Sequence, residues 1–110
     1  MNEIRERLLA RMQSIRAELT DITVDEDFAF ERVAEWMEEN VQDTEYTMDS
    51  SLFVTGAKLF IDVGGPDIYI DTRTNMIVGN WGTEHPQLSL DDAIIEYLED
   101  DTLVGERLKF

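Results

Sequence analysis

The sequence predicts an α+β fold with two N-terminal helices, a three-stranded antiparallel meander and one C-terminal helix. Apolar residues recur every three to four positions before residue 41 and again after residue 89, which is the helical period. Between residues 57 and 81 apolar and polar residues alternate, which is the strand period, and turn residues separate the alternating runs. We expect a single domain over residues 1–110, with a helix over residues 1–22 and an acidic α+β body over residues 23–110.

The first predicted helix, residues 2–20, carries a narrow apolar stripe. Its members alternate spacings of four and three residues, as in a packing seam between two helices. We expect this seam to be a self-association surface that gives a homodimer, with the arginines of the helix neutralising acids of a second copy. The alternative is that the helix folds back onto its own chain. The seam residues are Leu8, Met12, Ile15 and Leu19.

A second helix is predicted to end near Asn40. Thr23 with Glu26, or Asp25 itself, is suited to cap its start, because a side-chain oxygen there can accept a hydrogen bond from a free backbone N–H. The stretch 42–51 is polar and irregular, although its Tyr46 and Met48 fit a short edge strand. The glutamates expected on the outer side of this helix are Glu31, Glu35, Glu38 and Glu39.

The strands of the meander are predicted at residues 58–63, 67–71 and 76–81. Gly64-Gly65-Pro66-Asp67 makes the first turn, because glycine permits positive φ and proline fixes its own φ. Residues 72–75 make the second turn. The meander is antiparallel because both connections are short.

A third helix is predicted to open at a capping box formed by Ser89 and Asp92. It is crowded with acids, and those in its last turn oppose the helix macrodipole at about 0.3 to 1 kcal/mol each. A solvated face, a partner-binding patch and a divalent-metal site are the alternatives. No spaced ligand loop accompanies the acids, so we expect no metal. The candidate partner-binding residues are Asp92, Glu96, Glu99, Asp100 and Asp101.

The predicted hairpin offers a second cluster of candidate partner-binding residues. Asp62 and Asp67 flank the hairpin tip, and Tyr69 and Asp71 continue along the next strand. Residues two apart on a strand project from one face about 6.6 Å apart, close to the spacing of successive phosphates on a nucleic-acid strand. Carboxylates placed in this way imitate a row of phosphates. The alternative is that they serve turn hydrogen bonds.

The charge of the chain is strongly negative and unevenly distributed. Twenty-five acidic residues face nine basic ones, which gives a net charge of -16, and from Thr20 onward twenty-two acidic residues face five basic ones. Solubility of a small domain requires a net charge of only about 2 to 8. We therefore expect a basic protein partner. The same charge repels nucleic acid and anionic lipid, so we expect no direct nucleic-acid binding and no membrane association.

The sequence contains no catalytic motif, although His85 and the serines Ser50, Ser51 and Ser89 leave a Ser-His-Asp arrangement open on spacing alone. There is no cysteine, which excludes disulfides and thiolate metal ligands. His85 is the one histidine and has no accompanying nucleophile motif. Gly64-Gly65 lacks the remainder of a phosphate-binding loop and lies between aspartates that would repel phosphate. We expect no enzyme activity, no catalytic residue and no cofactor.

The segment Asp62-Val63-Gly64-Gly65-Pro66-Asp67-Ile68-Tyr69-Ile70, followed by Trp81-Gly82-Thr83 and a capped acidic helix, resembles small acidic proteins encoded by bacteriophages and mobile elements. The resemblance covers roughly residues 57–100. Proteins of this kind include anti-CRISPR and anti-restriction inhibitors. The resemblance implies a setting, the cytoplasm of a bacterial host, and no partner or functional residue transfers with it.

Two functions are therefore expected, and both are non-catalytic. The first is an acidic inhibitor or decoy that binds a nucleic-acid-binding bacterial defence protein by presenting carboxylates in place of phosphates. The alternative is a protein-protein interaction or assembly module of a phage or mobile element that self-associates through the first helix.

Overall fold

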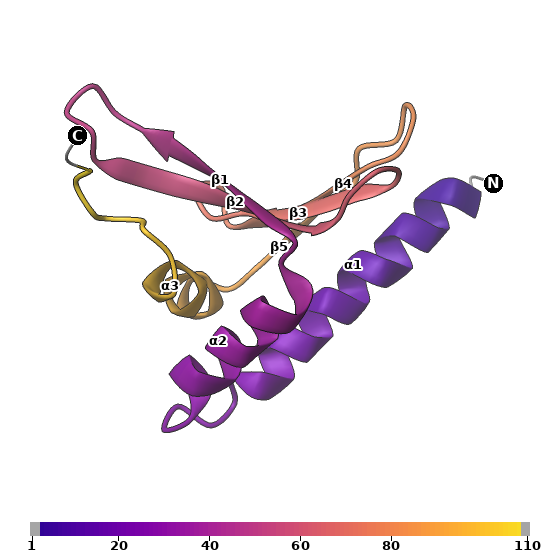
Figure 1. Ribbon diagram of the computed structural model, residues 1–110. Coiled ribbons are helices and arrows are strands. Elements are labelled where there is room, and N and C mark those ends of the chain that lie inside the picture. The colour runs from indigo at the N-terminus through magenta and orange to yellow at the C-terminus, as the bar shows by residue number, and fades with distance from the viewer. Residues whose placement is uncertain (1–2, 109–110) are drawn as a thin grey trace.

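The computed structural model describes residues 3–108 as three helices packed on one face of a five-stranded antiparallel sheet (Figure 1). This confirms the predicted α+β class. The helices are α1 (Glu3–Ile22), α2 (Ala29–Asn40) and α3 (Asp92–Asp100). The strands, which lie across the sheet in chain order, are β1 (Asp43–Met48), β2 (Val54–Asp62), β3 (Asp67–Asp71), β4 (Met76–Asn80) and β5 (Gln87–Ser89).

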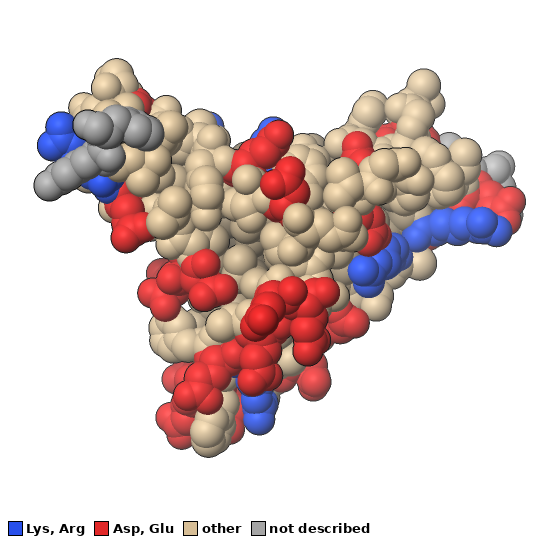
Figure 2. Space-filling model, viewed as in Figure 1, with Lys and Arg blue, Asp and Glu red and all other residues tan. Residues whose placement is uncertain are grey.

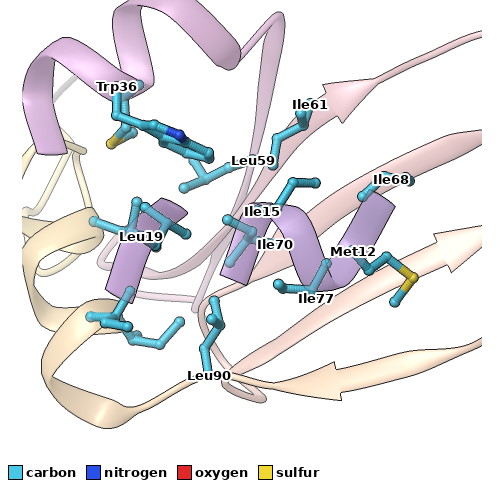
Figure 3. Packing of buried hydrophobic residues seen from close by; sticks show 14 of the residues in the cluster. Met12, Ile15, Leu19, Trp36, Leu59, Ile61, Ile68, Ile70, Ile77 and Leu90 are labelled. Atoms are coloured by element: carbon cyan, nitrogen blue, oxygen red, sulfur yellow. The ribbon is translucent and has the colours of Figure 1, made fainter. Parts of the chain in front are cut away.

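The core lies between the helices and one face of β2, β3 and β4. Because side chains alternate along a strand, the odd residues of β2 and the even residues of β3 share this face. Figure 3 shows three residues of α1 directed at the isoleucines of β3 and β4. At Gly79 an added Cβ would lie 2.8 Å from Met12 Sδ, so the glycine permits close approach of α1 to β4. The buried strand residues are Leu59, Ile61, Ile68, Ile70 and Ile77.

The apolar seam of α1 packs inside the chain, which corrects the expectation of a self-association surface. Each seam residue is at most 1% exposed and belongs to the single core cluster. The alternative, in which the helix folds back onto its own chain, is the arrangement observed. A spacing of four and three residues suits a sheet surface as well as a second helix, so the pattern does not distinguish them. The residues are Leu8, Met12, Ile15 and Leu19.

The sheet has five strands where three were predicted. The three central strands and their turns are confirmed, with Gly64 and Gly65 both at φ +93° and Asn75 at φ 56°. The two further strands are the edges of the sheet: β1, which contains Tyr46 and Met48 and confirms the short edge strand considered for the stretch 42–51, and β5, which was not predicted. Their sequences lack a continuous apolar alternation because an edge strand buries little, and pairing with a neighbour decides their conformation.

The predicted helix caps are also corrected. α2 begins at Ala29 after Phe28, with no side-chain cap, and the Thr23 hydroxyl instead donates to the Leu19 carbonyl at 2.7 Å, where α1 ends. Ser89 belongs to β5, so it does not cap α3. The residue before α3 is Asp91, whose side chain makes no cap hydrogen bond.

Candidate functional site: the acidic surface of α2 and α3

The acids of α2 and α3 form one continuous surface. The two helices lie side by side, and the rings of Phe30 and Tyr97 meet edge to face with centroids 4.8 Å apart. α2 buries Val33 and Trp36 against the core, so its glutamates point to solvent. Figure 2 shows the carboxylates gathered over the region that α2 and α3 occupy in Figure 1. This acidic helix surface consists of Glu31, Glu35, Glu38, Glu39, Glu96, Glu99, Asp100 and Asp101.

The carboxylates of the acidic helix surface make few interactions with the rest of the described residues. With the exception of Glu99, none of its carboxylates makes a hydrogen bond or ion pair within residues 3–108. Neither helix carries a basic residue in its last turn, so the acids there oppose the macrodipole without compensation. The acids in the last turns therefore oppose folding slightly, and local structure does not account for them, whereas Glu31 lies in the first turn of α2, where a negative charge suits the macrodipole.

Glu99 is the exception because it joins α3 to the sheet. Thr72 is 4% exposed, and its hydroxyl accepts a hydrogen bond from the Ala57 N–H at 3.0 Å and donates to the Glu99 carboxylate. Burial raises the pKa of Glu99 above its usual range, the hydrogen bond from Thr72 opposes the rise, and the neighbouring Glu96 adds to it. A proton therefore binds Glu99 more tightly in the folded chain than in the unfolded one.

We predict that Glu99→Gln stabilises the fold at pH 7. Because the folded-state pKa is raised, the stabilisation linked to protonation is complete below the unfolded pKa and is lost as pH rises through the folded pKa. A permanently neutral glutamine avoids that loss, so the Tm at pH 7 should rise and the gain should shrink toward pH 4. Thermal unfolding followed by circular dichroism measures both.

The control for this prediction is Glu106→Gln, which removes one exposed charge outside the helices, away from their macrodipoles. It should change the Tm less than Glu99→Gln does. A gain from Glu99→Gln that is equal at pH 4 and pH 7 would show that the effect is unrelated to ionisation of this side chain.

The acids of the hairpin lie elsewhere and have structural roles. Asp62 accepts a hydrogen bond from Arg11 Nε of α1 at 3.2 Å, on the helix side of the sheet, because the pairing register shifts between residues 60 and 62. Asp67 accepts from the Gly64 N–H at 2.8 Å, and Asp71 accepts from the N–H of residue 73 at 3.0 Å. The predicted row of Asp62, Asp67 and Asp71 is therefore divided between the two faces.

Tyr69 lies between Asp67 and Asp71 on the sheet face that no described helix covers. Its ring packs on Phe60 of β2 with centroids 5.1 Å apart, and Lys58 Nζ lies 5.3 Å from the Tyr69 ring centroid. By register, these side chains share that face. We call it the open sheet face. Asp67, Tyr69 and Asp71 are thus on the opposite side of the sheet from the acidic helix surface, whereas Asp62 lies on the helix side.

Asp92 belongs to neither group. It lies in the first turn of α3, where a negative charge suits the macrodipole, and its carboxylate accepts a hydrogen bond from the Asn75 side chain. It therefore joins α3 to the turn between β3 and β4. The sequence had grouped it with the later acids because one short helix carries them all.

The one histidine and groups of metal-binding side chains are the remaining candidate sites. His85 Nδ1 lies 2.7 Å from Asn80 Oδ1 on the surface. Within residues 3–108 no three acidic or histidine side chains are grouped so that they could hold a metal ion. Among the described helices none has the length and apolar content needed to cross a membrane.

Comparisons with protein-family models, with curated proteins and with solved structures give no match to this chain. The function is therefore inferred from the surface itself. The glutamates of α2 are the part of that surface that the sequence analysis did not propose, although the spacing of Glu31, Glu35 and Glu38 by four and three residues places them on one helix face.

Proposed function

We propose that this protein is a decoy that binds a nucleic-acid-binding protein by placing carboxylates in the sites where that protein binds phosphates. The observation that carries the proposal is that the acidic helix surface is almost free of internal partners, whereas the acids of the hairpin are engaged in turns and with Arg11. Violations of local stability rules concentrate at functional sites. An external partner of opposite charge accounts for the unpaired acids at the ends of α2 and α3.

The arrangement of the charges supports a phosphate-binding partner. Glu31 and Glu35 lie one turn apart, about 6 Å along the α2 axis, and α3 adds a second row beside them. Two rows of exposed carboxylates raise the negative potential over this side of the molecule and steer a groove lined by lysine and arginine toward it. A nucleic-acid-binding protein of bacterial defence, such as a nuclease, has a groove of this kind and is the partner that we propose.

The proposal is tested by capture of proteins from a bacterial lysate on the immobilised protein. Captured proteins should be released by duplex DNA and by raising the salt concentration, because attraction between exposed charges is screened beyond about 8 Å at physiological ionic strength. Reversing Glu96, Asp100 and Asp101 to lysine should weaken capture by about tenfold or more without lowering the Tm.

The matched control reverses three exposed acids that lie outside the acidic helix surface, Asp21, Glu26 and Glu106, and gives the same net charge. It should weaken capture much less. Equal losses from the two triple variants would mean that only the total charge matters. Capture that neither DNA nor salt disturbs would exclude the decoy function.

The second candidate is a non-catalytic interaction module, and the open sheet face favours it. Aromatic side chains surrounded by polar ones are typical of the centres of protein interfaces. Phe60 and Tyr69 have this setting. Loss of salt-insensitive capture in a Phe60→Ser, Tyr69→Ser variant would support this candidate over the decoy.

A further inference from the structure

The free edge of β1 carries backbone groups that β2 does not use. Within residues 3–108, β1 is the first strand of the sheet and pairs with β2 alone. Opposite Tyr46, Ala57 exchanges hydrogen bonds of 3.0 Å with Thr72, so the backbone of Ala57 faces away from β1. In an antiparallel ladder, pairs of opposite residues alternate. In one kind of pair the backbone N–H and C=O groups bond to each other, and in the next kind they point away from each other. The N–H and C=O of Tyr46, and those of Thr44 two residues earlier, therefore point to the free edge.

The surroundings of Thr44 agree with this direction. Its N–H donates to the Asp43 carboxylate at 2.9 Å and not to β2. The carboxylate occupies the place that a carbonyl of a further strand would take, and acidic side chains on an edge strand are a common protection against unwanted pairing. The edge is thus able to accept a strand that can displace or pair with Asp43.

A shallow groove lies between this edge and the C-terminal ends of α2 and α3. Thr44 borders it on the sheet side, and an apolar floor is formed by Ala34, Met37 and Val41. All three charged side chains that line the groove are carboxylates, namely Glu35, Glu38 and Asp101. An apolar floor beside a strand edge suits the side chains of an extended peptide, and the rim selects positive charge.

We propose that this groove binds an extended segment of the partner in which basic and apolar residues alternate, added to the sheet as a strand beside β1. Alternate side chains of such a segment point to opposite faces. The basic set enters the groove, where the aliphatic stems lie on the apolar floor and the charged heads reach the carboxylate rim, and the apolar set lies on the opposite face of β1. The inference deepens the proposed function, on which it rests for the source of the segment.

The probe for this site is an acetylated and amidated octapeptide of alternating arginine and valine. It should bind with one-to-one stoichiometry in calorimetry and should slow amide hydrogen exchange at Thr44 and Tyr46 by at least about tenfold, since both N–H groups become paired. A peptide with the same residues in two blocks should bind about fivefold or more weakly. Unchanged exchange at both amides in the presence of saturating peptide would overturn the proposal.

Variants of the protein separate strand addition from general attraction. Glu35→Gln with Glu38→Gln, on the rim, should weaken binding about fivefold, whereas Glu31→Gln with Glu39→Gln, on the same helix outside the groove, should have a smaller effect. Thr44→Pro removes an edge donor that the ladder does not use and should weaken binding about tenfold. Equal losses from the two glutamine pairs would indicate diffuse attraction and would overturn the proposal.

The outcome is independent of the lysate experiment. If the peptide does not protect the amides of Thr44 and Tyr46, peptide binding in the groove is excluded. The decoy function is then still tested by competition with DNA. If the peptide protects both amides but duplex DNA does not release the captured proteins, peptide binding in the groove is supported and the decoy function is excluded.

Discussion

Replacing Leu19 with aspartate is expected to unfold the chain. Leu19 is fully buried where α1 meets the rest of the core. Truncation of a buried leucine costs about 2 to 5 kcal/mol, and an unpaired buried carboxylate adds several more. A domain of this size has a free energy of unfolding of about 5 to 15 kcal/mol. Circular dichroism should show loss of the helical signal and of a cooperative urea transition.

The control is Ala17→Asp, which adds the same charge to the exposed side of α1 two residues earlier. It should remain folded with nearly the same Tm. A Leu19→Asp protein that stays folded with an unchanged Tm would contradict the burial of this side chain in the core.

Replacing Trp36 with alanine is expected to cost about 3 to 5 kcal/mol of unfolding free energy. The indole is 7% exposed and lies in the core where α1 and α2 meet, and its Nε1–H donates to Glu18 Oε2 at 3.2 Å. Removal of the ring leaves a cavity that the surrounding strands cannot close. Urea unfolding monitored by circular dichroism measures the loss.

Trp36→Phe separates packing from the hydrogen bond. It keeps most of the ring and removes the donor to Glu18, so it should cost about 1 to 2 kcal/mol. If phenylalanine is as damaging as alanine, the hydrogen bond between α1 and α2 outweighs the packing of the ring.

The candidate site was partly predictable from the sequence. The late acids of α3, Glu96, Asp100 and Asp101, were proposed because they oppose the helix macrodipole, and the structure leaves them exposed and unpaired. Their partner role stays a prediction. The contribution of α2 was not predictable, because nothing in the local pattern indicates that α2 lies beside α3. Turn hydrogen bonds were the alternative explanation that the sequence offered for the hairpin acids. The register shift after Phe60, which separates Asp62 from the other hairpin acids, was not predicted.

The sequence by itself determined the class of each central element. The helical period of α1 and the alternation over β2, β3 and β4 arise from local geometry, since each periodicity matches one buried face. The sequence also determined the negative net charge and its concentration after Thr20.

Only the tertiary structure decided what each surface contacts. A seam such as that from Leu8 to Leu19 can pack on a second copy or on a sheet, and the sheet is formed by residues 43–89, which come later in the chain. The edge strands β1 and β5 form because neighbouring strands pair with them, and their own sequences do not require it. The groove beside Thr44 exists because α2, α3 and β1 meet there, which is a property of packing between distant segments.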